Sequence, residues 1–245
     1  LLLIDVLMTT NLCTAMNKVE IGTKEFSKCF WNKIFSESSN WSEEKHILFK
    51  IMRQLETLTD KAQNPTGSIP PFTSYTLYCL TRFLQPTNIL EVGTYIGKST
   101  LSMAYGLNKK GSKIHTCDFN NDIELINNTQ CKIIQYHGVS TDMFKYLRQE
   151  KDIKFNLVNI DGRIPAEDVD DLVSILEDDA VICLDDFEGI EKGVVNHKTF
   201  IDSYKFENYA LIYPPQDSLI KELQFTGNCT TALMIPQSLI SFVRQ

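Results

Sequence analysis

Short apolar runs alternate with amphipathic stretches along the chain from residue 68 onward. Runs that are rich in β-branched and other apolar side chains, bounded by turn residues, are typical of strands buried in a sheet. Stretches in which apolar residues recur every three or four positions predict helices. The predicted strands are 88–92, 113–117, 131–136, 155–160, 180–184, 209–213 and 230–235. The predicted helices are 74–84, 99–107, 141–149, 166–176 and 189–204.

This alternation predicts an α/β fold, namely a Rossmann-like, doubly wound sheet of seven strands. Strands that are joined by helices run parallel in such a sheet, and ligands bind outside the carboxyl ends of the strands. The last two predicted strands have no clear helix between them. We therefore expect a mostly parallel sheet with an antiparallel edge at its C-terminal side.

The N-terminal part of the chain has a different pattern. Apolar residues recur at helical spacing from Phe26 to Phe35 and again from Ile47 to Leu58. Residues 64–71 read Asn-Pro-Thr-Gly-Ser-Ile-Pro-Pro, a run of turn formers that predicts a loop. We divide the chain into an N-terminal helical extension, residues 1–67, and an α/β domain, residues 68–245. The extension is expected to form a lid or the contact of a homodimer.

Composition narrows the classes of function. The formal net charge of −7 argues against general nucleic-acid binding. The apolar stretch at residues 1–8 is far shorter than the ~18 residues of a membrane span, so no membrane association is expected. The seven cysteines contain no Cys-x-x-Cys pair, which predicts buried, reduced thiols. We expect a cytoplasmic protein that acts on a small molecule.

A glycine-containing turn follows the first predicted strand, in the sequence Glu91-Val-Gly93-Thr94-Tyr95-Ile-Gly97-Lys-Ser99. Glycine permits a tight turn and a close approach of ligand to backbone, and Gly97 opens a helix whose free N–H groups face the ligand. The spacing Glu-x-Gly-x-x-x-Gly differs from the Gly-x-Gly-x-x-Gly of dinucleotide sites, which disfavours a nicotinamide-dependent dehydrogenase. Thr94 and Tyr95 crowd the turn, which suits an uncharged or zwitterionic ligand better than a pyrophosphate.

Polar residues also follow the second and third predicted strands. Asp118 and Phe119 end the second strand. A carboxylate at this position can accept hydrogen bonds from both hydroxyls of a ribose. Ser140 lies in the turn after the third strand, where it could touch the edge of an adenine.

Three more acids follow the fourth and fifth strands, Asp161 after the fourth and the pair Asp185–Asp186 after the fifth. Neighbouring strand ends are about 5 Å apart, so the three carboxylates should converge. Such a cluster is costly unless a cation neutralises it. Hard oxygen ligands suit Mg²⁺, Ca²⁺ or Mn²⁺.

The order and spacing of these motifs resemble those of class I S-adenosylmethionine-dependent methyltransferases, from about Ser68 to the C-terminus. The resemblance implies that S-adenosylmethionine is the cofactor. By the same resemblance the cofactor-binding residues are Glu91, Gly93, Thr94, Tyr95, Gly97, Ser99, Asp118, Phe119, Ser140 and Asp161.

The acids after the fourth and fifth strands resemble those of metal-dependent small-molecule O-methyltransferases of the catechol, caffeoyl-coenzyme A and macrolide-sugar types. That resemblance implies a divalent metal, Mg²⁺ first, held by Asp161, Asp185 and Asp186. It also implies a hydroxylated small molecule as the methyl acceptor and a role in natural-product biosynthesis.

One position departs from those families, which often carry a Lys or His base just after the strand-four acid. Here Arg163 stands nearby, and an arginine does not lose its proton in a protein. Arg163 could instead bind an anionic group of the substrate. A metal would then have to lower the pKa of the acceptor hydroxyl, or the base would be His197 or His137. The catalytic candidates are Asp161, Arg163 and His197.

Two other functions stay open on the sequence. One is a metal-independent N- or O-methyltransferase in which the acids are structural. The other is a non-catalytic scaffold that binds S-adenosylmethionine.

Overall fold

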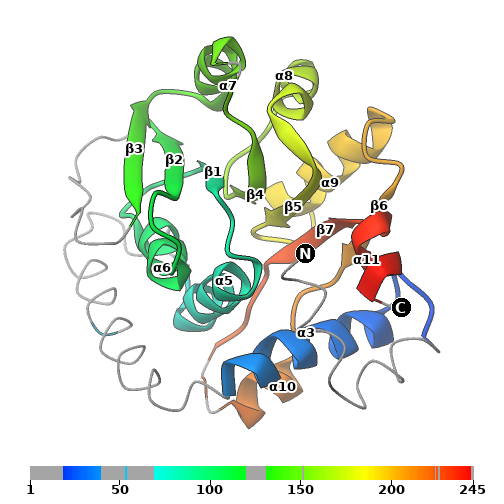
Figure 1. Cartoon of the computed structure of the whole chain (residues 1–245). Helices are drawn as coiled ribbons and strands as arrows, with labels where there is room; N and C mark the ends of the chain where they lie inside the picture. Colours follow the sequence, from blue (N-terminus) through cyan, green and yellow to red (C-terminus); the bar gives the residue numbers. More distant parts are fainter. Residues whose placement is uncertain are drawn as a thin grey trace.

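Seven strands form one sheet in the order β3-β2-β1-β4-β5-β7-β6 (Figure 1). The computed structural model describes residues 19–39, 53, 69–119, 131–150, 152–223, 225 and 227–243. The strands are β1 (Asn88–Val92), β2 (Lys113–Asp118), β3 (Lys132–His137), β4 (Phe155–Ile160), β5 (Leu176–Leu184), β6 (Tyr209–Ile212) and β7 (Ala232–Pro236).

The first five strands run parallel, and β7 pairs antiparallel with both β5 and β6. The predicted seven-stranded, mostly parallel sheet with an antiparallel C-terminal edge is therefore confirmed. The carboxyl ends of β1, β2, β4 and β5 lie on the same edge of the sheet, so the turns that follow them can form one site.

Helices cover both faces of the sheet (Figure 1). Two separate hydrophobic clusters result, one shared with α3, α5 and α6 and the other with α7, α8 and α9. Neighbouring residues of β4 serve opposite faces, since Leu157 belongs to the first cluster and Val158 to the second. The helices are α3 (Lys24–Ser39), α5 (Pro71–Leu84), α6 (Lys98–Gly106), α7 (Ser140–Gln149), α8 (Val169–Ser174), α9 (Lys192–Asp202), α10 (Asp217–Glu222) and α11 (Gln237–Val243), with a 3₁₀ turn, η2 (Ala166–Asp168), before α8.

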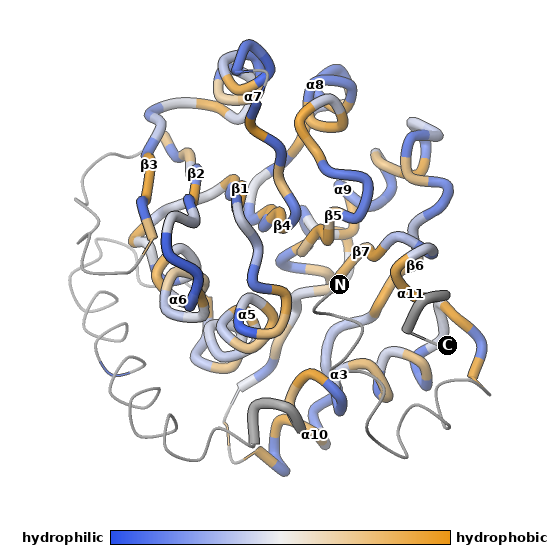
Figure 2. Tube along the Cα trace, in the orientation of Figure 1, coloured by the Kyte–Doolittle hydropathy of each residue, from blue (hydrophilic) through white to orange (hydrophobic). Residues whose placement is uncertain are grey.

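Hydropathy follows this layering. Figure 2 shows hydrophobic residues along the central strands, whereas hydrophilic residues gather on the outer parts of α7 and α8. The strands β1, β2 and β4 are almost wholly buried, although they contain polar residues such as Glu91, His115 and Asn159.

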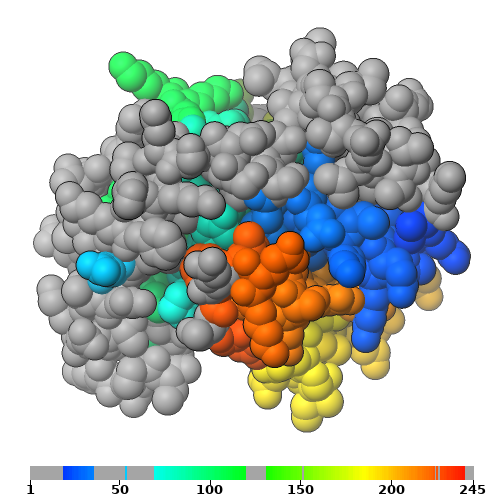
Figure 3. Space-filling view, turned by 90° about the horizontal axis from the view of Figure 1, so that it is seen from below, coloured from blue at the N-terminus to red at the C-terminus, as the bar shows by residue number. Residues whose placement is uncertain are grey.

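The helix α3 packs on the main sheet. Its Trp31 is fully buried, and the indole Nε1 donates a hydrogen bond to the backbone oxygen of Tyr213, at 2.7 Å. The Tyr213 N–H in turn donates to the Ser27 hydroxyl, at 2.9 Å. Farther along α3, the Phe35 ring stacks on Tyr75 of α5 with centroids 5.6 Å apart. Figure 3 shows α3, in blue, lying against the orange segment that contains α10.

Some predicted boundaries were wrong. A short helix, α10, separates β6 from β7, and α11 follows β7, where the sequence had suggested no helix. Each is too short to show a helical repeat. The strand β5 begins at Leu176 rather than at residue 180, because Glu177, Asp178 and Asp179 are exposed and mask the strand pattern.

Other expectations of the sequence have mixed outcomes. The six described cysteines are free thiols and five are buried, as predicted. Within the part of the chain that the structure describes, every helix is too short or too polar to cross a membrane. The helical pattern of 47–58, apart from residue 53, and the boundary at residue 67 lie outside the described residues, so both stay predictions.

Candidate active site

The turn after β1, residues 93–97, is held close to β2 and β4. The backbone N–H groups of Gly93 and Thr94 both donate to the Cys117 oxygen, at 3.0 and 3.2 Å. Gly93 has φ +98°, and a Cβ built there would lie 2.9 Å from the backbone oxygen of Asp161. Only glycine lets this turn approach Asp161 so closely. We call residues 93–97 the glycine turn.

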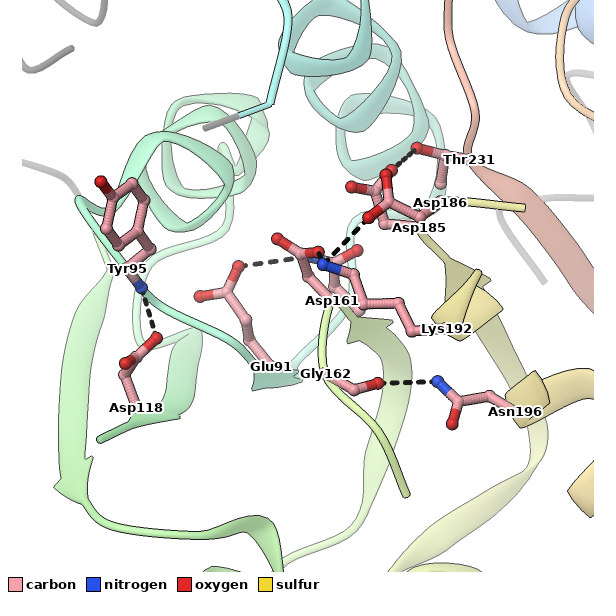
Figure 4. A network of polar contacts seen from close by, with 11 residues as sticks. Glu91, Tyr95, Asp118, Asp161, Gly162, Asp185, Asp186, Lys192, Asn196 and Thr231 are labelled. Atoms are coloured by element: carbon pink, nitrogen blue, oxygen red, sulfur yellow. Dashed lines mark hydrogen bonds and ion pairs between the residues drawn. The ribbon is translucent and has the colours of Figure 1, made fainter. Parts of the chain in front are cut away.

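The glycine turn leads into α6 through left-handed residues. Gly97 has φ +80° and stands at the N-cap of α6, while Tyr95 has φ +43°. The Tyr95 N–H donates to Oδ2 of Asp118 at the end of β2, at 2.7 Å (Figure 4). This hydrogen bond ties the turn to the acid that the sequence assigns to ribose binding.

Glu91 is fully buried beneath the turn. Its carboxylate accepts hydrogen bonds from the hydroxyls of Thr100 and Thr116, the latter at 2.7 Å, and from the Asn159 amide, at 3.2 Å. Burial raises the pKa of Glu91, and these hydrogen bonds, with one from Ser99, oppose that shift. Glu91 therefore joins β1 to α6, β2 and β4.

The other cofactor-binding candidates lie around this edge of the sheet. Ser99 and Thr94 are buried, and Ser140 is the buried first residue of α7. Phe119 directly follows Asp118 and is 71% exposed. These positions put each candidate in a turn or helix start that follows a strand end.

Asp161, Asp185 and Asp186 come together as the sequence predicted. One oxygen from each lies within 4.8 Å of the others. We call these three residues the carboxylate cluster. Oδ1 of Asp185 accepts a hydrogen bond from Thr231, at 2.7 Å, and Asp186 has φ +52°. Burial first, and then the charge of Asp185, raises the pKa of Asp161.

A lysine that the sequence reasoning missed lies inside the carboxylate cluster (Figure 4). Nζ of Lys192 is 2.5 Å from Oδ1 of Asp161 and 3.0 Å from Oδ2 of Asp186. Burial alone would lower the pKa of Lys192, but the charge and hydrogen bonds of the two carboxylates outweigh it and raise the pKa. Lys192 is the first residue of α9. A lysine that faces solvent at this position would give the same sequence pattern, so the sequence did not identify it.

Two neighbours of Lys192 on α9 explain its position. A Cβ on Gly193 would lie 2.3 Å from the Asp185 oxygen, so glycine lets α9 start directly against the end of β5. One turn later, Asn196 is fully buried. Its amide donates to the Gly162 oxygen, at 2.7 Å, and its oxygen accepts from the Ile164 N–H, at 2.9 Å. α9 thus fixes both the cluster and the loop that follows β4.

The structure does not bring all catalytic candidates together. Arg163 is exposed on the loop after β4. His197 is half-buried on α9, edge-on to the Phe187 ring with centroids 5.7 Å apart, and burial lowers its pKa. His137 ends β3, with β2 and β1 between it and β4, and it is exposed.

The residues of the carboxylate cluster fit a divalent metal by their chemistry. Three carboxylates supply hard oxygen donors, and the Lys192 ammonium among them shows that the space accepts a cation. The lysine contacts two of the same carboxylates that a metal would need.

A cavity of about 410 Å³ has Phe187, the residue after Asp186, in its lining. We call it the Phe187 cavity. Its volume falls in the range of small-molecule sites. The cavity is lined by Lys24, Ser27, Phe187, Glu188, Gly189, Val194, Tyr213, Pro214 and Gln216.

Comparison with known proteins agrees with this arrangement. Residues 90–187 match the family described as a methyltransferase domain. A search of curated proteins finds no match.

Several solved structures share the fold at low sequence identity. An O-methyltransferase from Bacillus cereus in complex with S-adenosylhomocysteine is 17% identical, with a TM-score of 0.59, over 76% of this chain and 89% of that chain. An O-methyltransferase of tomaymycin synthesis from Streptomyces achromogenes, in complex with S-adenosylmethionine, is 15% identical, with a TM-score of 0.59 and the same coverage.

A methyltransferase from Podospora anserina bound to S-adenosylhomocysteine is 13% identical, with a TM-score of 0.53, over 82% of this chain and 95% of that chain. The strand order, the family match and these structures agree with the resemblance noted in the motifs. Residues 90–187 therefore match a methyltransferase domain, and the chain has the fold of these methyltransferase structures.

Proposed function

We propose that this chain transfers the methyl group of S-adenosylmethionine to a hydroxyl oxygen of a small molecule. The observation that carries the proposal is the contact between the glycine turn and the carboxylate cluster. The Cβ that Gly93 lacks would lie 2.9 Å from the backbone oxygen of Asp161. A cofactor bound at the turn would thus present its methyl group beside the carboxylates, where an acceptor oxygen could be held.

The cofactor would be bound by residues at the carboxyl edge of the sheet. Asp118 would take the ribose hydroxyls, and Phe119 and Ser140 would flank the adenine. The Asp118 carboxylate accepts a hydrogen bond from the Tyr95 N–H, which aligns it with the glycine turn. Two neighbouring folds hold S-adenosylhomocysteine and one holds S-adenosylmethionine, which supports the same cofactor here.

The acceptor would enter through the Phe187 cavity, because Phe187 directly follows Asp186 of the carboxylate cluster. Phe187 and Tyr213 line it with rings 6.4 Å apart and nearly perpendicular, at 76°. These rings suit an acceptor with a flat or apolar part, whose hydroxyl would point towards Asp161 and Asp186. Proximity and alignment would supply most of the rate, because the sulfonium methyl is already activated.

We assign a divalent cation, Mg²⁺ first, to the carboxylate cluster. When bound there, it would supply positive charge that lowers the pKa of the acceptor hydroxyl. Thr231 would keep the Asp185 carboxylate in place. His197, whose ring is edge-on to Phe187 and whose pKa is lowered by burial, would be the base that accepts the proton of the acceptor.

One observation favours a second candidate, a metal-independent N- or O-methyltransferase. Lys192 already supplies a positive charge to the carboxylate cluster, at 2.5 Å from Asp161. In that case the ammonium, rather than a metal, would stabilise the developing negative charge on the acceptor.

Methyl transfer from labelled S-adenosylmethionine to a panel of hydroxylated aromatic and sugar compounds tests the proposal. We expect turnover with Mg²⁺, little turnover in excess EDTA, and a loss of about 100-fold in Asp185→Asn. Asp179→Asn is the matched control, because it removes the same charge from the exposed start of the same strand. Full activity in EDTA would favour the metal-independent candidate, whereas no turnover on any compound would favour a non-catalytic scaffold that binds S-adenosylmethionine.

A further inference from the structure

We infer that Lys192 competes with the divalent metal for the carboxylate cluster. Its ammonium holds the site assembled when no metal is bound and sets the affinity with which metal enters. This inference rests on the proposed metal site. It adds that the site contains its own exchangeable cation, which the metal must displace.

The Lys192 ammonium and a bound metal would contact the same carboxylates of the cluster. Lys192 Nζ lies 2.5 Å from Oδ1 of Asp161 and 3.0 Å from Oδ2 of Asp186. One oxygen from each carboxylate lies within 4.8 Å of the others, so a metal that contacts all three must sit between them. A metal at the usual ~2.1–2.5 Å from these oxygens would overlap the ammonium.

The exchange requires the side chain of Lys192 to move while its backbone stays in place. The missing Cβ of Gly193 would lie 2.3 Å from the Asp185 oxygen, so the start of α9 is locked against β5. The hydrogen bonds of Asn196 to the loop after β4 lock the next turn of the helix. The Lys192 side chain itself is 28% exposed, and its four-carbon stem can swing the ammonium into solvent.

Either the Lys192 ammonium or a divalent metal would neutralise part of the negative charge of the carboxylate cluster. When all three carboxylates are ionised, one ammonium leaves a formal charge of −2 at the cluster. A divalent metal leaves −1 and is therefore the better neutraliser. Without either cation, three partly buried carboxylates would repel one another, which would destabilise the fold.

Direct binding of Mn²⁺ to the full chain tests the competition without any need for turnover. We expect Lys192→Met to bind Mn²⁺ about 10- to 100-fold more tightly than the wild type in titration calorimetry. In EDTA the same variant should unfold at a lower temperature, and Mn²⁺ should raise that temperature by more than in the wild type. Lys198→Met, an exposed lysine on the same helix, should behave like the wild type in both measurements.

Lys192→Arg keeps the experiment decisive if the methionine variant does not fold. A guanidinium can bind carboxylates through two parallel hydrogen bonds, so this variant should fold and bind Mn²⁺ more weakly than the wild type. Equal or weaker Mn²⁺ binding in Lys192→Met, or tighter binding in Lys192→Arg, would overturn the inference. A chain that shows the competition but methylates nothing would instead overturn the proposed function.

Discussion

At the scale of single residues, two glycines determine how closely the parts of the site approach one another. A Cβ on Gly93, in the glycine turn, would lie 2.9 Å from the Asp161 backbone oxygen. A Cβ on Gly193, at the start of α9, would lie 2.3 Å from the Asp185 backbone oxygen. A glycine inside a helix costs about 1 kcal/mol relative to alanine. At position 193 that cost is offset by the contact, because a methyl group there would collide with backbone that is fixed in the sheet.

His115 is a residue whose protonation should affect stability. It is buried on β2, with Nδ1 2.9 Å from the Tyr136 hydroxyl and its ring stacked on that of Tyr136. Burial, followed by the charges of Lys113 and Lys132, lowers the pKa of His115 to about 4. Since the unfolded chain keeps a pKa near 6.5, it binds more protons than the folded chain between these two values.

We predict that this histidine makes the fold less stable as the pH falls from 6.5 towards 4. After allowance for solvent screening, the loss should be about 1–2 kcal/mol. Urea unfolding of the wild type and of His115→Gln across this range gives the measurement, and the difference between the two curves isolates the histidine. The prediction fails if that difference does not change with pH.

At the scale of elements, α9 connects the site to the fold. Lys192 and Asn196 are four residues apart and so project from the same side of the helix. Lys192 contacts two acids, and Asn196 pairs with two backbone groups of the loop that follows β4. The helix therefore positions Asp161 both through its carboxylate and through the loop that begins there.

Removing the Asn196 side chain should weaken the fold measurably. Asn196→Ala leaves the buried Ile164 N–H and the Gly162 oxygen without their partner, at 2.9 and 2.7 Å in the wild type. Each of the two unsatisfied groups costs about 1–3 kcal/mol, so we expect a loss of about 2–6 kcal/mol in the free energy of unfolding by urea. Lys198→Ala, an exposed change on the same helix, should stay within about 0.5 kcal/mol of the wild type. A loss in Asn196→Ala as small as that of the control would show that the loop does not depend on α9.

The sequence predicted the positions of the strands and the edge of the sheet at which their ends meet. The strands β1, β2 and β4 are mostly buried and β3 alternates between buried and more exposed positions, and the sequence located all four within a residue or two. The convergence of Asp161 with Asp185 was predictable, because parallel strands end at a common edge. α10 was not predictable, since a helix of six residues with two buried side chains shows no repeat.

The side chains that contact the predicted acids could not be predicted from the sequence. Whether Lys192 faces the carboxylate cluster or solvent depends on how α9 is rotated and how closely Gly193 lets it approach β5. Likewise, the hydroxyls of Thr100 and Thr116 come from two different elements to meet Glu91. Such contacts follow from packing in three dimensions, and no local pattern encodes them.

At the scale of the whole molecule, the strand ends that we propose as the cofactor site also join the elements of the sheet. Asp118 ends β2 and accepts the Tyr95 N–H from the turn after β1, at 2.7 Å. Ligand bound across this edge would therefore link β1, β2 and β4 in addition to the bonds that the protein makes itself. A cofactor that binds only the folded state must then raise the stability of the entire chain.

We predict that S-adenosylhomocysteine at 100 times its dissociation constant raises the free energy of unfolding by about 2.7 kcal/mol. For a chain of this size the unfolding temperature should rise by about 5–10 °C. Asp118→Ala should lose most of that rise, because it removes both the proposed ribose acceptor and the anchor of the glycine turn. Asp178→Ala, an exposed acid at the far end of the sheet, should keep it in full. An undiminished rise in Asp118→Ala would show that the cofactor does not bind across these strand ends. An equal rise with a nicotinamide dinucleotide would show that the site does not select S-adenosylhomocysteine.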